Sequence, residues 1–299
     1  IASAASRMVH AAGSRDLIEM GARRAHEHAA VAAARAAYLA GFSATSNLAA
    51  GEIYGIPTKG TAAHAFTLAH DSEEEAFAAQ IQTMGAGTTL LIDTFDISQG
   101  VERAVAIGGT QLGAVRIDSG DLPVVVSQVR AHLDQLGATT TKIVVTNDLN
   151  EHTIAGLRGA PVDVFGVGTS VVTGSGHPAA ALVYKLVART DDAGSWVPVA
   201  KKSSNKTHHG GAKRAFRMLE SGTATGDALV LGDEAAPEES RPLTHDFLVG
   251  GSSTENTLQP GLLESARKHH REAIEELPDT AFSLSPGNPV FSASLLGAG

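Results

Sequence analysis

The sequence contains no cysteine, which excludes disulfide bonds, thiolate metal sites and a cysteine nucleophile. It has no apolar run close to the roughly 20 residues of a membrane-spanning helix, and no charged-then-apolar leader opens it. Basic residues (23 Lys and Arg) are outnumbered by acidic ones (32 Asp and Glu), which gives a formal net charge of −9 at pH 7. This acidity argues against nucleic acid or an anionic membrane as partner. We therefore expect a cytoplasmic protein.

The composition that remains is typical of a folded protein. Hydrophobic residues make up 43% of the 299 residues and charged residues 18%, a balance that excludes intrinsic disorder. The length suits one large or two ordinary domains. Because the first residue is isoleucine rather than methionine, we expect the chain to be a fragment or a processed form.

Four short apolar runs give the main indication of the fold. They are rich in β-branched residues, are too short for helices, end in polar residues, and lie at 88–92, 112–117, 142–145 and 162–165. Helical patterns at 122–136 and 151–157 separate the later runs. A strand–helix repeat of roughly 20–30 residues predicts a parallel sheet with right-handed crossovers, either open or closed. We favour an irregular α/β barrel, because its strand ends would ring one pocket.

The sequence also predicts two further helices and a more polar C-terminal third. Residues 19–39 are rich in alanine, the best helix former, and residues 263–277 have an amphipathic, charged pattern. The last third of the chain is more polar, and 203–213 is predicted to be a loop rich in lysine and histidine. We therefore divide the chain into a barrel portion, 1–187, and a smaller C-terminal α/β portion, 188–299, which completes a second domain.

The first candidate site is the segment Arg-Ile-Asp-Ser-Gly-Asp at 116–121, at the end of a predicted strand. Arg116 and Asp118 are two residues apart and share one face of that strand. A guanidinium offers a rigid fork of donors for a phosphate, and Asp118 could orient it or accept from sugar hydroxyls. A structural arginine–aspartate pair that closes the strand end explains the pattern equally well.

A glycine- and hydroxyl-rich segment follows the last predicted strand. Gly166, Gly168 and Thr169 belong to it, and backbone N–H groups left open by glycine can cradle a phosphate. The spacing matches neither a Walker loop nor a dinucleotide fingerprint. The alternative is a tight turn between strand and helix.

Three more residues are candidates for chemistry. His64 lies among small apolar residues and is a candidate nucleophile or acid–base group, although a lone histidine is more often structural. Asp93 lies at a strand end, where it could bind Mg²⁺ through water or cap the next helix. Arg23 adds positive charge at the start of the alanine-rich helix, where it meets an anion or is simply solvated.

Taken together, these segments resemble the nicotinate phosphoribosyltransferase family. The resemblance is clear over residues 15–220 and looser beyond, and it is carried by the segments 19–26 (EMGARRAH), 43–49 (SATSNLA), 60–66 (GTAAHAF), 91–96 (LIDTFD), 116–121 (RIDSGD), 145–148 (VTND) and 166–174 (GVGTSVVTG). It implies a type II phosphoribosyltransferase, built as an irregular α/β barrel beside a second α/β domain. It also implies a homodimer with shared active sites.

The resemblance further implies the reaction and its co-substrates. Nicotinate is joined to phosphoribosyl pyrophosphate to give nicotinate mononucleotide and pyrophosphate, in the biosynthesis of NAD. Hydrolysis of ATP is coupled to the transfer through a phosphorylated histidine, which corresponds to His64. Mg²⁺ holds the leaving group, and Asp93 is the residue we assign to it.

Each site residue is transferred from the family by its motif. Asp118 is assigned to catalysis, and Arg116 and Ser119 share its motif at the phosphoribosyl group. Arg23 corresponds to a residue at the nicotinate and pyrophosphate end, and Asn47 to the residue that reads the acid or amide of the pyridine. The 5′-phosphate and ribose contacts correspond to Asn147, Asp148, Gly166, Gly168 and Thr169.

This sequence departs from the family at two points. The family commonly has an aromatic residue, which stacks on the pyridine ring, at the position of Met20. It also has a long N-terminal segment that completes the neighbouring subunit's site and that this chain lacks. A nicotinamide or quinolinate phosphoribosyltransferase of the same fold and an inactive phosphate-binding fragment are the alternatives. Asn47 argues against the nicotinamide enzyme, which carries an acid there.

Overall fold

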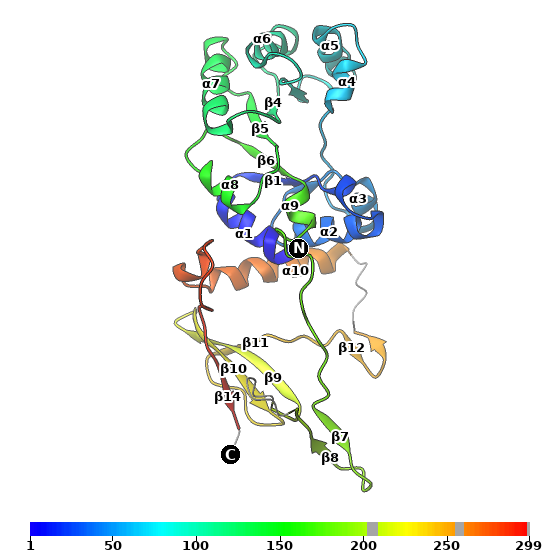
Figure 1. Ribbon diagram of the computed structural model, residues 1–299, viewed down its shortest axis with the longest axis vertical. Coiled ribbons are helices and arrows are strands. Elements are labelled where there is room, and N and C mark those ends of the chain that lie inside the picture. The colour runs from blue at the N-terminus through cyan, green and yellow to red at the C-terminus, as the bar shows by residue number, and fades with distance from the viewer. Residues whose placement is uncertain (202–208, 255–259, 298–299) are drawn as a thin grey trace. The chain divides into compact units, whose positions relative to one another are not determined.

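The computed structural model describes residues 1–201, 209–254 and 260–297 (Figure 1). Residues 203–208 of the predicted lysine- and histidine-rich loop lie outside that part of the chain. The chain forms two compact units: the first is Ile1–Pro178 with Leu258–His270, and the second is Ala179–Thr257 with Arg271–Gly299. The domain boundary that we place at residue 187 stays a prediction.

The first unit is built on a six-stranded, wholly parallel sheet. Its strands are β1 (Asp16–Glu19), β2 (Ala44–Thr45), β3 (Thr89–Leu91), β4 (Ala114–Ile117), β5 (Lys142–Val145) and β6 (Val164–Val167). Their spatial order is β2-β1-β6-β5-β4-β3.

This strand order is that of a barrel with one opening. In a closed barrel of parallel strands, sequential strands are neighbours and the first strand also pairs with the last. Here β1 pairs with β6, with Leu17 opposite Phe165, while β2 and β3 form the two edges of the sheet. The predicted irregular α/β barrel is confirmed, and its irregularity is the missing pairing between β2 and β3.

The edge of β2 is partly covered by the segment that leads to His64. Thr45 forms an isolated parallel bridge with Thr58. The Thr45 N–H donates to the carbonyl of Pro57, and the Lys59 N–H donates to the carbonyl of Thr45, both at 3.0 Å. This extra pairing anchors the segment just before His64 on one side of the barrel opening.

The strands predicted from the apolar runs are confirmed as β3, β4, β5 and β6. Their β-branched side chains are buried because helices cover the sheet: Val115, Ile117, Ile143 and Val145 are all fully buried. The bounds of β5 match the prediction, whereas β6 begins two residues after the predicted start at 162.

Helices follow each of these strands and surround the barrel. Helices α5, α6 and α7 pack on one another in series, and α7 also packs on β5 (Figure 1). The helices of this unit are α1 (Ala2–Ala12), η1 (Ala22–Arg24), α2 (Glu27–Leu39), α3 (Leu48–Tyr54), α4 (His64–Leu68), α5 (Glu73–Met84), α6 (Ile97–Gly108), α7 (Leu122–Gln135), α8 (Glu151–Gly156) and α9 (Thr169–Val172).

The helix predicted at 19–39 is wrong in its first part. Glu19 ends strand β1, and the continuous helix α2 begins only at Glu27. The His26 side chain caps it by accepting a hydrogen bond from the N–H of His28. The alanine signal came from the true helix, whose buried face consists of Ala30, Ala33, Ala34 and Ala37.

The first part of α10 (Pro260–Glu275) completes the first unit from a distant part of the sequence. Leu263 is buried in an apolar cluster with Ala34, Ala50 and Ile56. The guanidinium of Arg267 lies 4.3 Å from the ring centre of Tyr38 and donates to the backbone carbonyls of Tyr38 and Phe42. The amphipathic helix predicted at 263–277 is confirmed.

The second unit is mainly antiparallel. Its four-stranded sheet has the order β11-β9-β10-β14, and it contains β9 (Lys213–Glu220), β10 (Thr223–Leu231), β11 (Ser240–Pro242) and β14 (Ala293–Leu296). Two small hairpins pair β7 (Ala188–Thr190) with β8 (Trp196–Pro198) and β12 (Leu248–Val249) with β13 (Ser252–Ser253), and η2 is Asp279–Phe282. Within the described ranges, no helix has the length and apolar character needed to cross a bilayer.

Candidate functional site

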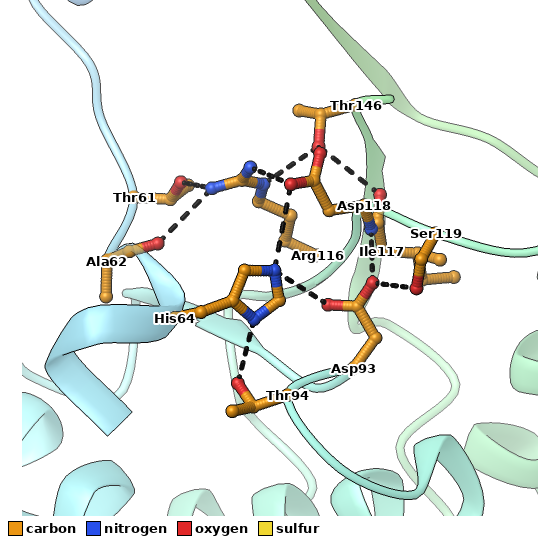
Figure 2. A network of polar contacts seen from close by, with 10 residues as sticks. All are labelled: Thr61, Ala62, His64, Asp93, Thr94, Arg116, Ile117, Asp118, Ser119 and Thr146. Carbon is orange, nitrogen blue, oxygen red and sulfur yellow. Dashed lines mark hydrogen bonds and ion pairs between the residues drawn. The ribbon is translucent and has the colours of Figure 1, made fainter. Parts of the chain in front are cut away.

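Charged and hydroxyl side chains gather at the carboxyl ends of β3, β4 and β5 (Figure 2). Asp93 follows β3, Asp118 follows β4 and Thr146 follows β5. His64, the first residue of α4, faces them. Because the strands are parallel neighbours, residues far apart in sequence are brought together at the carboxyl ends of the strands.

Asp93 is the buried anchor of this cluster. One carboxylate oxygen, Oδ2, accepts the backbone N–H of Asp118 at 2.8 Å and the hydroxyl of Ser119 at 2.6 Å. The other oxygen, Oδ1, is buried and has no hydrogen-bond partner among the described residues. A buried carboxylate oxygen without a donor is costly, so it marks a place where a cation or a donor is expected.

Arg116 ties three segments together. Its Nε donates to the hydroxyl of Thr146 at 2.9 Å, and its Nη1 donates to the Thr61 hydroxyl at 2.6 Å and the Ala62 carbonyl at 3.2 Å. Its Nη2 lies 3.1 Å from Asp118 Oδ2. The structural arginine–aspartate pair expected from the sequence is therefore present, and contact with a phosphate stays a prediction.

His64 is held between a hydroxyl and two carboxylates. Its Nδ1 lies 3.1 Å from the hydroxyl of Thr94. Its Nε2 lies 4.0 Å from Asp93 Oδ1 and 3.8 Å from Asp118 Oδ2, and the side chain is 40% exposed (Figure 2). A histidine so oriented and open to solvent can act as a nucleophile or a proton carrier, which a fully enclosed core histidine cannot.

The donor set also bears on a metal ion. In the part of the chain that the structure describes, no group of three or more His, Asp or Glu side chains is arranged to hold a metal. Mg²⁺, however, usually binds through one or two carboxylates and takes its other ligands from substrate phosphates and water. Asp93, whose Oδ1 accepts no hydrogen bond from the described residues, and the neighbouring Asp118 fit that second arrangement.

The residues predicted after β5 have a strained backbone. Asn147 has φ of 87° and Asp148 has φ of 48°, so two consecutive non-glycine residues are left-handed. Both side chains are exposed at the carboxyl end of the strand. Asparagine and aspartate adopt this conformation more readily than other non-glycine residues. The role of both residues in binding stays a prediction.

The glycines within β6 and directly after it, Gly166 and Gly168, are explained partly by packing. A Cβ at Gly166 would lie 2.6 Å from Thr146 Cγ2 and 2.8 Å from Met20 Sδ, so no larger residue fits there. At Gly168 the nearest atom to such a Cβ is the carbonyl oxygen of Met20, at 3.3 Å. Thr169 begins the short helix α9 and is exposed. The Met20 side chain thus lies against the ends of β5 and β6.

Glu151 holds the far end of this glycine-rich segment. The carboxylate is buried, and it accepts Arg7 Nε at 2.9 Å and the hydroxyl of Ser175 at 2.7 Å. Burial acts to raise the pKa of Glu151, but the hydrogen bonds from Ser175, its own backbone and Arg7 lower that pKa overall. The folded protein therefore favours the ionised carboxylate.

We predict that Glu151→Gln destabilises the protein at neutral pH and weakens its acid sensitivity. Because the folded-state pKa is depressed, the contribution of the carboxylate is present above its unfolded pKa, about 4.3 for glutamate, and is lost as the pH falls through the lower folded value. We expect a loss of about 1–3 kcal/mol at pH 7. Thermal unfolding from pH 3 to 7 measures this.

The exposed Glu102, which lies 3.5 Å from His132, provides the control. Glu102→Gln should leave the unfolding temperature within about 2 °C of the parent at pH 7, as expected for a surface substitution. Equal stability of Glu151→Gln and the parent at pH 7 would contradict the proposed anchoring.

The two remaining predicted residues, Arg23 and Asn47, follow β1 and β2, which lie on the opposite side of the sheet from β3 and β4. Arg23 is exposed in η1, just after β1. Asn47 is buried just after β2, where its Oδ1 caps α3 by accepting the N–H of Ala50 at 3.0 Å. The hydrogen bonds that join the His64 cluster come from β3, β4, β5 and the segment before α4, so they do not include these two residues.

The sequence did not identify the hydroxyls that organise the cluster. Thr61 and Thr146 bind Arg116, and Thr94 binds His64. Thr94 and Thr146 directly follow Asp93 and β5, so their places at strand ends were a usable signal. Glu19 was also missed, because it was assigned to a helix, and it is fully buried.

The fold and this site together define a protein of the incomplete α/β-barrel class, with its polar residues at the carboxyl ends of the strands. The model of the nicotinate phosphoribosyltransferase (NAPRTase) family matches residues 16–210. A nicotinate phosphoribosyltransferase of Mycobacterium tuberculosis is 51% identical over 97% of this chain and 65% of its own length. One of Bacillus subtilis is 39% identical over 81% of this chain and 51% of its own length. The chain belongs to the nicotinate phosphoribosyltransferase family.

Solved structures agree with this fold. The human nicotinic acid phosphoribosyltransferase superimposes with a TM-score of 0.76 at 24% identity, covering 98% of this chain and 71% of that one. The nicotinate-nucleotide pyrophosphorylase of Pyrococcus furiosus gives 0.73 at 22% identity, covering 92% of this chain and 69% of that one. The chain spans 65% of the length of its mycobacterial relative, so it corresponds to only part of that protein.

Proposed function

We propose that this chain carries the catalytic site of a nicotinate phosphoribosyltransferase. The site joins nicotinate to phosphoribosyl pyrophosphate and yields nicotinate mononucleotide and pyrophosphate, in the biosynthesis of NAD. The observation that carries the proposal is the cluster of His64, Asp93, Arg116 and Asp118, which gathers around one sheet edge in a chain that belongs to this family.

The chemistry of the transfer requires such a cluster. As pyrophosphate leaves the anomeric carbon, positive charge develops on the ribose and negative charge on the leaving group. Asp118 provides acceptor oxygens for the sugar, and Arg116 provides positive charge for a phosphate. Arg23 and Asn47 are assigned to the pyrophosphate and nicotinate end, where the NH₂ of Asn47 can donate to a carboxylate.

His64 couples ATP hydrolysis to this transfer. With Nδ1–H donated to Thr94, the lone pair of Nε2 is available for attack on the γ-phosphorus of ATP. A P–N bond forms as the bond from that phosphorus to the bridging oxygen breaks, and ADP leaves. Water later cleaves the P–N bond and releases phosphate.

Asp93 and Asp118 would hold Mg²⁺ here together with the phosphates of the substrate. Bound in this place, the ion would supply positive charge for the leaving pyrophosphate. The buried Oδ1 of Asp93, which accepts no hydrogen bond from the described residues, supports this assignment. The chain's own residues position the Asp93 carboxylate, since the backbone N–H of Asp118 and the hydroxyl of Ser119 both donate to its Oδ2.

Our proposals for the oligomeric state and the cellular location of the protein are based on its family. We propose a cytoplasmic homodimer in which each subunit completes the other's site, with the family's N-terminal segment supplying the contribution. Asn47, an amide donor at the pyridine end, favours nicotinate over nicotinamide as substrate.

Direct assay tests the proposal. Purified chain is incubated with nicotinate, phosphoribosyl pyrophosphate, ATP and Mg²⁺, and nicotinate mononucleotide is measured by chromatography; nicotinamide and quinolinate replace nicotinate in parallel. The assay is repeated with the chain joined to the N-terminal segment of its mycobacterial relative. We expect product from nicotinate, more of it with the added segment, and none after Asp118→Asn. Product formed only from nicotinamide or quinolinate, or none from either form, would overturn the proposal.

A further inference from the structure

Glu19 is a buried carboxylate that the reaction described above does not use. It lies at the end of β1, and its side chain has no exposed surface. Its two oxygens have different partners: Oε1 accepts the N–H of Gly21 at 2.5 Å, and Oε2 accepts the hydroxyl of Thr45 at 2.6 Å. Within the described ranges, no arginine, lysine or histidine forms an ion pair with it. A buried carboxylate without a cation is rare, which calls for a specific explanation.

The Thr45 hydroxyl connects Glu19 to Asn47 by two hydrogen bonds. It donates to Glu19 and at the same time accepts the backbone N–H of Asn47 at 3.0 Å. The side-chain Oδ1 of Asn47 accepts the N–H of Ala50, which turns its NH₂ away from the start of α3. The orientation of that NH₂ therefore depends on a chain of contacts that begins at Glu19.

The Gly21 contact acts on the segment with Arg23. Gly21 immediately precedes η1, and a Cβ at this position would lie 2.9 Å from both Glu19 Oε1 and the carbonyl oxygen of Gly168. The turn is thus fixed tightly between β1 and the start of α9. One carboxylate consequently holds the two backbone segments that carry Asn47 and Arg23.

We infer that Glu19 is a positioning residue for the pyridine-carboxylate end of the active site: through Thr45 and Gly21 it sets the places of Asn47 and Arg23. The inference rests on the proposed function. Burial raises the pKa of Glu19, and the hydrogen bonds from Thr45 and Gly21 oppose that rise because they favour the ionised carboxylate. An ionised carboxylate binds a hydroxyl and a backbone N–H more strongly than a neutral acceptor does. Two strand ends held by one buried group move little, which preorganises the donors for an aromatic acid.

The first test separates nicotinate binding from the rest of the reaction. Thr45→Val keeps the shape of the side chain but removes its hydroxyl. Thr45→Ser retains the hydroxyl and removes the methyl group. In the full chain joined to the family's N-terminal segment, we expect Thr45→Val and Glu19→Gln to raise the KM for nicotinate about tenfold or more. In Thr45→Val, the kcat and the KM for phosphoribosyl pyrophosphate should stay within about twofold, and Thr45→Ser should behave like the parent. Glu19→Gln also releases the Gly21 turn before Arg23, so it should raise the KM for phosphoribosyl pyrophosphate as well.

Ser43→Ala is the matched control. The Ser43 hydroxyl donates to the carbonyl of Leu17 at 3.1 Å, so this variant also loses a hydrogen bond between the β1 and β2 segments, but one without a link to Glu19. Its kinetic constants should equal those of the parent. Circular dichroism confirms that each variant is folded.

A second measurement does not depend on the reaction. Amide hydrogen exchange should accelerate in residues 20–25 and 46–50 of Glu19→Gln and Thr45→Val, and remain unchanged in Ser43→Ala. If the parent shows no transferase activity but exchange changes as expected, the proposed function fails while the contact chain stands. Unchanged exchange in both segments, or an equal rise of the KM for nicotinate and the KM for phosphoribosyl pyrophosphate in Thr45→Val, would overturn the positioning role.

Discussion

Arg116→Ala should weaken the binding of phosphoribosyl pyrophosphate by about 10- to 150-fold, which corresponds to about 1.5–3 kcal/mol. The guanidinium is the positive group that faces Asp118 at the end of β4, and a charge-assisted fork is lost when it is removed. The variant should also melt at a lower temperature, since Thr61 and Thr146 lose a partner. Titration calorimetry on protein shown to be folded by circular dichroism measures the affinity.

Two further variants make this result specific. Arg116→Lys keeps the positive charge but not the fork, so it should bind nearly as weakly as Arg116→Ala. Arg130 is the matched control: it is also partly buried and donates to the Thr141 and Ala138 carbonyls, but it lies in α7. Arg130→Ala should lose stability and retain affinity. Parent-like affinity in Arg116→Ala would refute its assignment to the phosphoribosyl group.

His64→Ala should abolish phosphoryl transfer from ATP while some nicotinate mononucleotide is still formed. The imidazole is the nucleophile in the proposed coupling, whereas the sugar contacts belong to Asp118 and Arg116, so the two activities should separate. Incubation with ATP labelled at the γ-phosphate measures the first activity. The bound label should be labile to acid and stable to base, as a phosphoryl-imidazole is, and should fall to background in the variant.

His132 provides the control for this experiment. It is also a partly buried histidine beside a carboxylate, with Nε2 3.5 Å from Glu102, but it lies in α7. His132→Ala should label like the parent. A parent protein that never takes up label, yet makes more product when ATP is hydrolysed, would contradict the role of His64.

The barrel could be predicted from the sequence to the extent that its strands carry a local signal. Strands β3 to β6 are continuous β-branched runs, because both faces of a covered parallel sheet are buried. Strand β1 has aspartate and glutamate at its ends, and β2 has only two residues, so neither shows that pattern. The burial of Glu19 depends on Thr45 and Gly21, which only the fold brings within reach.

In the site, too, some contacts could be predicted from local sequence spacing, whereas others depend on the fold. Arg116 and Asp118 could be paired from their spacing, since residues two apart on a strand share a face, and the structure places them 3.1 Å apart. The contacts of Asp93 with Ser119, and of His64 with Asp118, connect different strands and loops. They depend on strand order and register, which no local pattern in the sequence encodes.

The discontinuous first unit has a consequence for how the chain folds during synthesis. Strand β6, the last of the barrel sheet, ends at Val167, but Leu263, which packs on Ala34 and Ile56, is made much later. At roughly 5–20 residues per second, several seconds separate the two events on the ribosome. Throughout that interval the barrel sheet can assemble, while the apolar patch destined for Leu263 is still open to water and to other nascent chains.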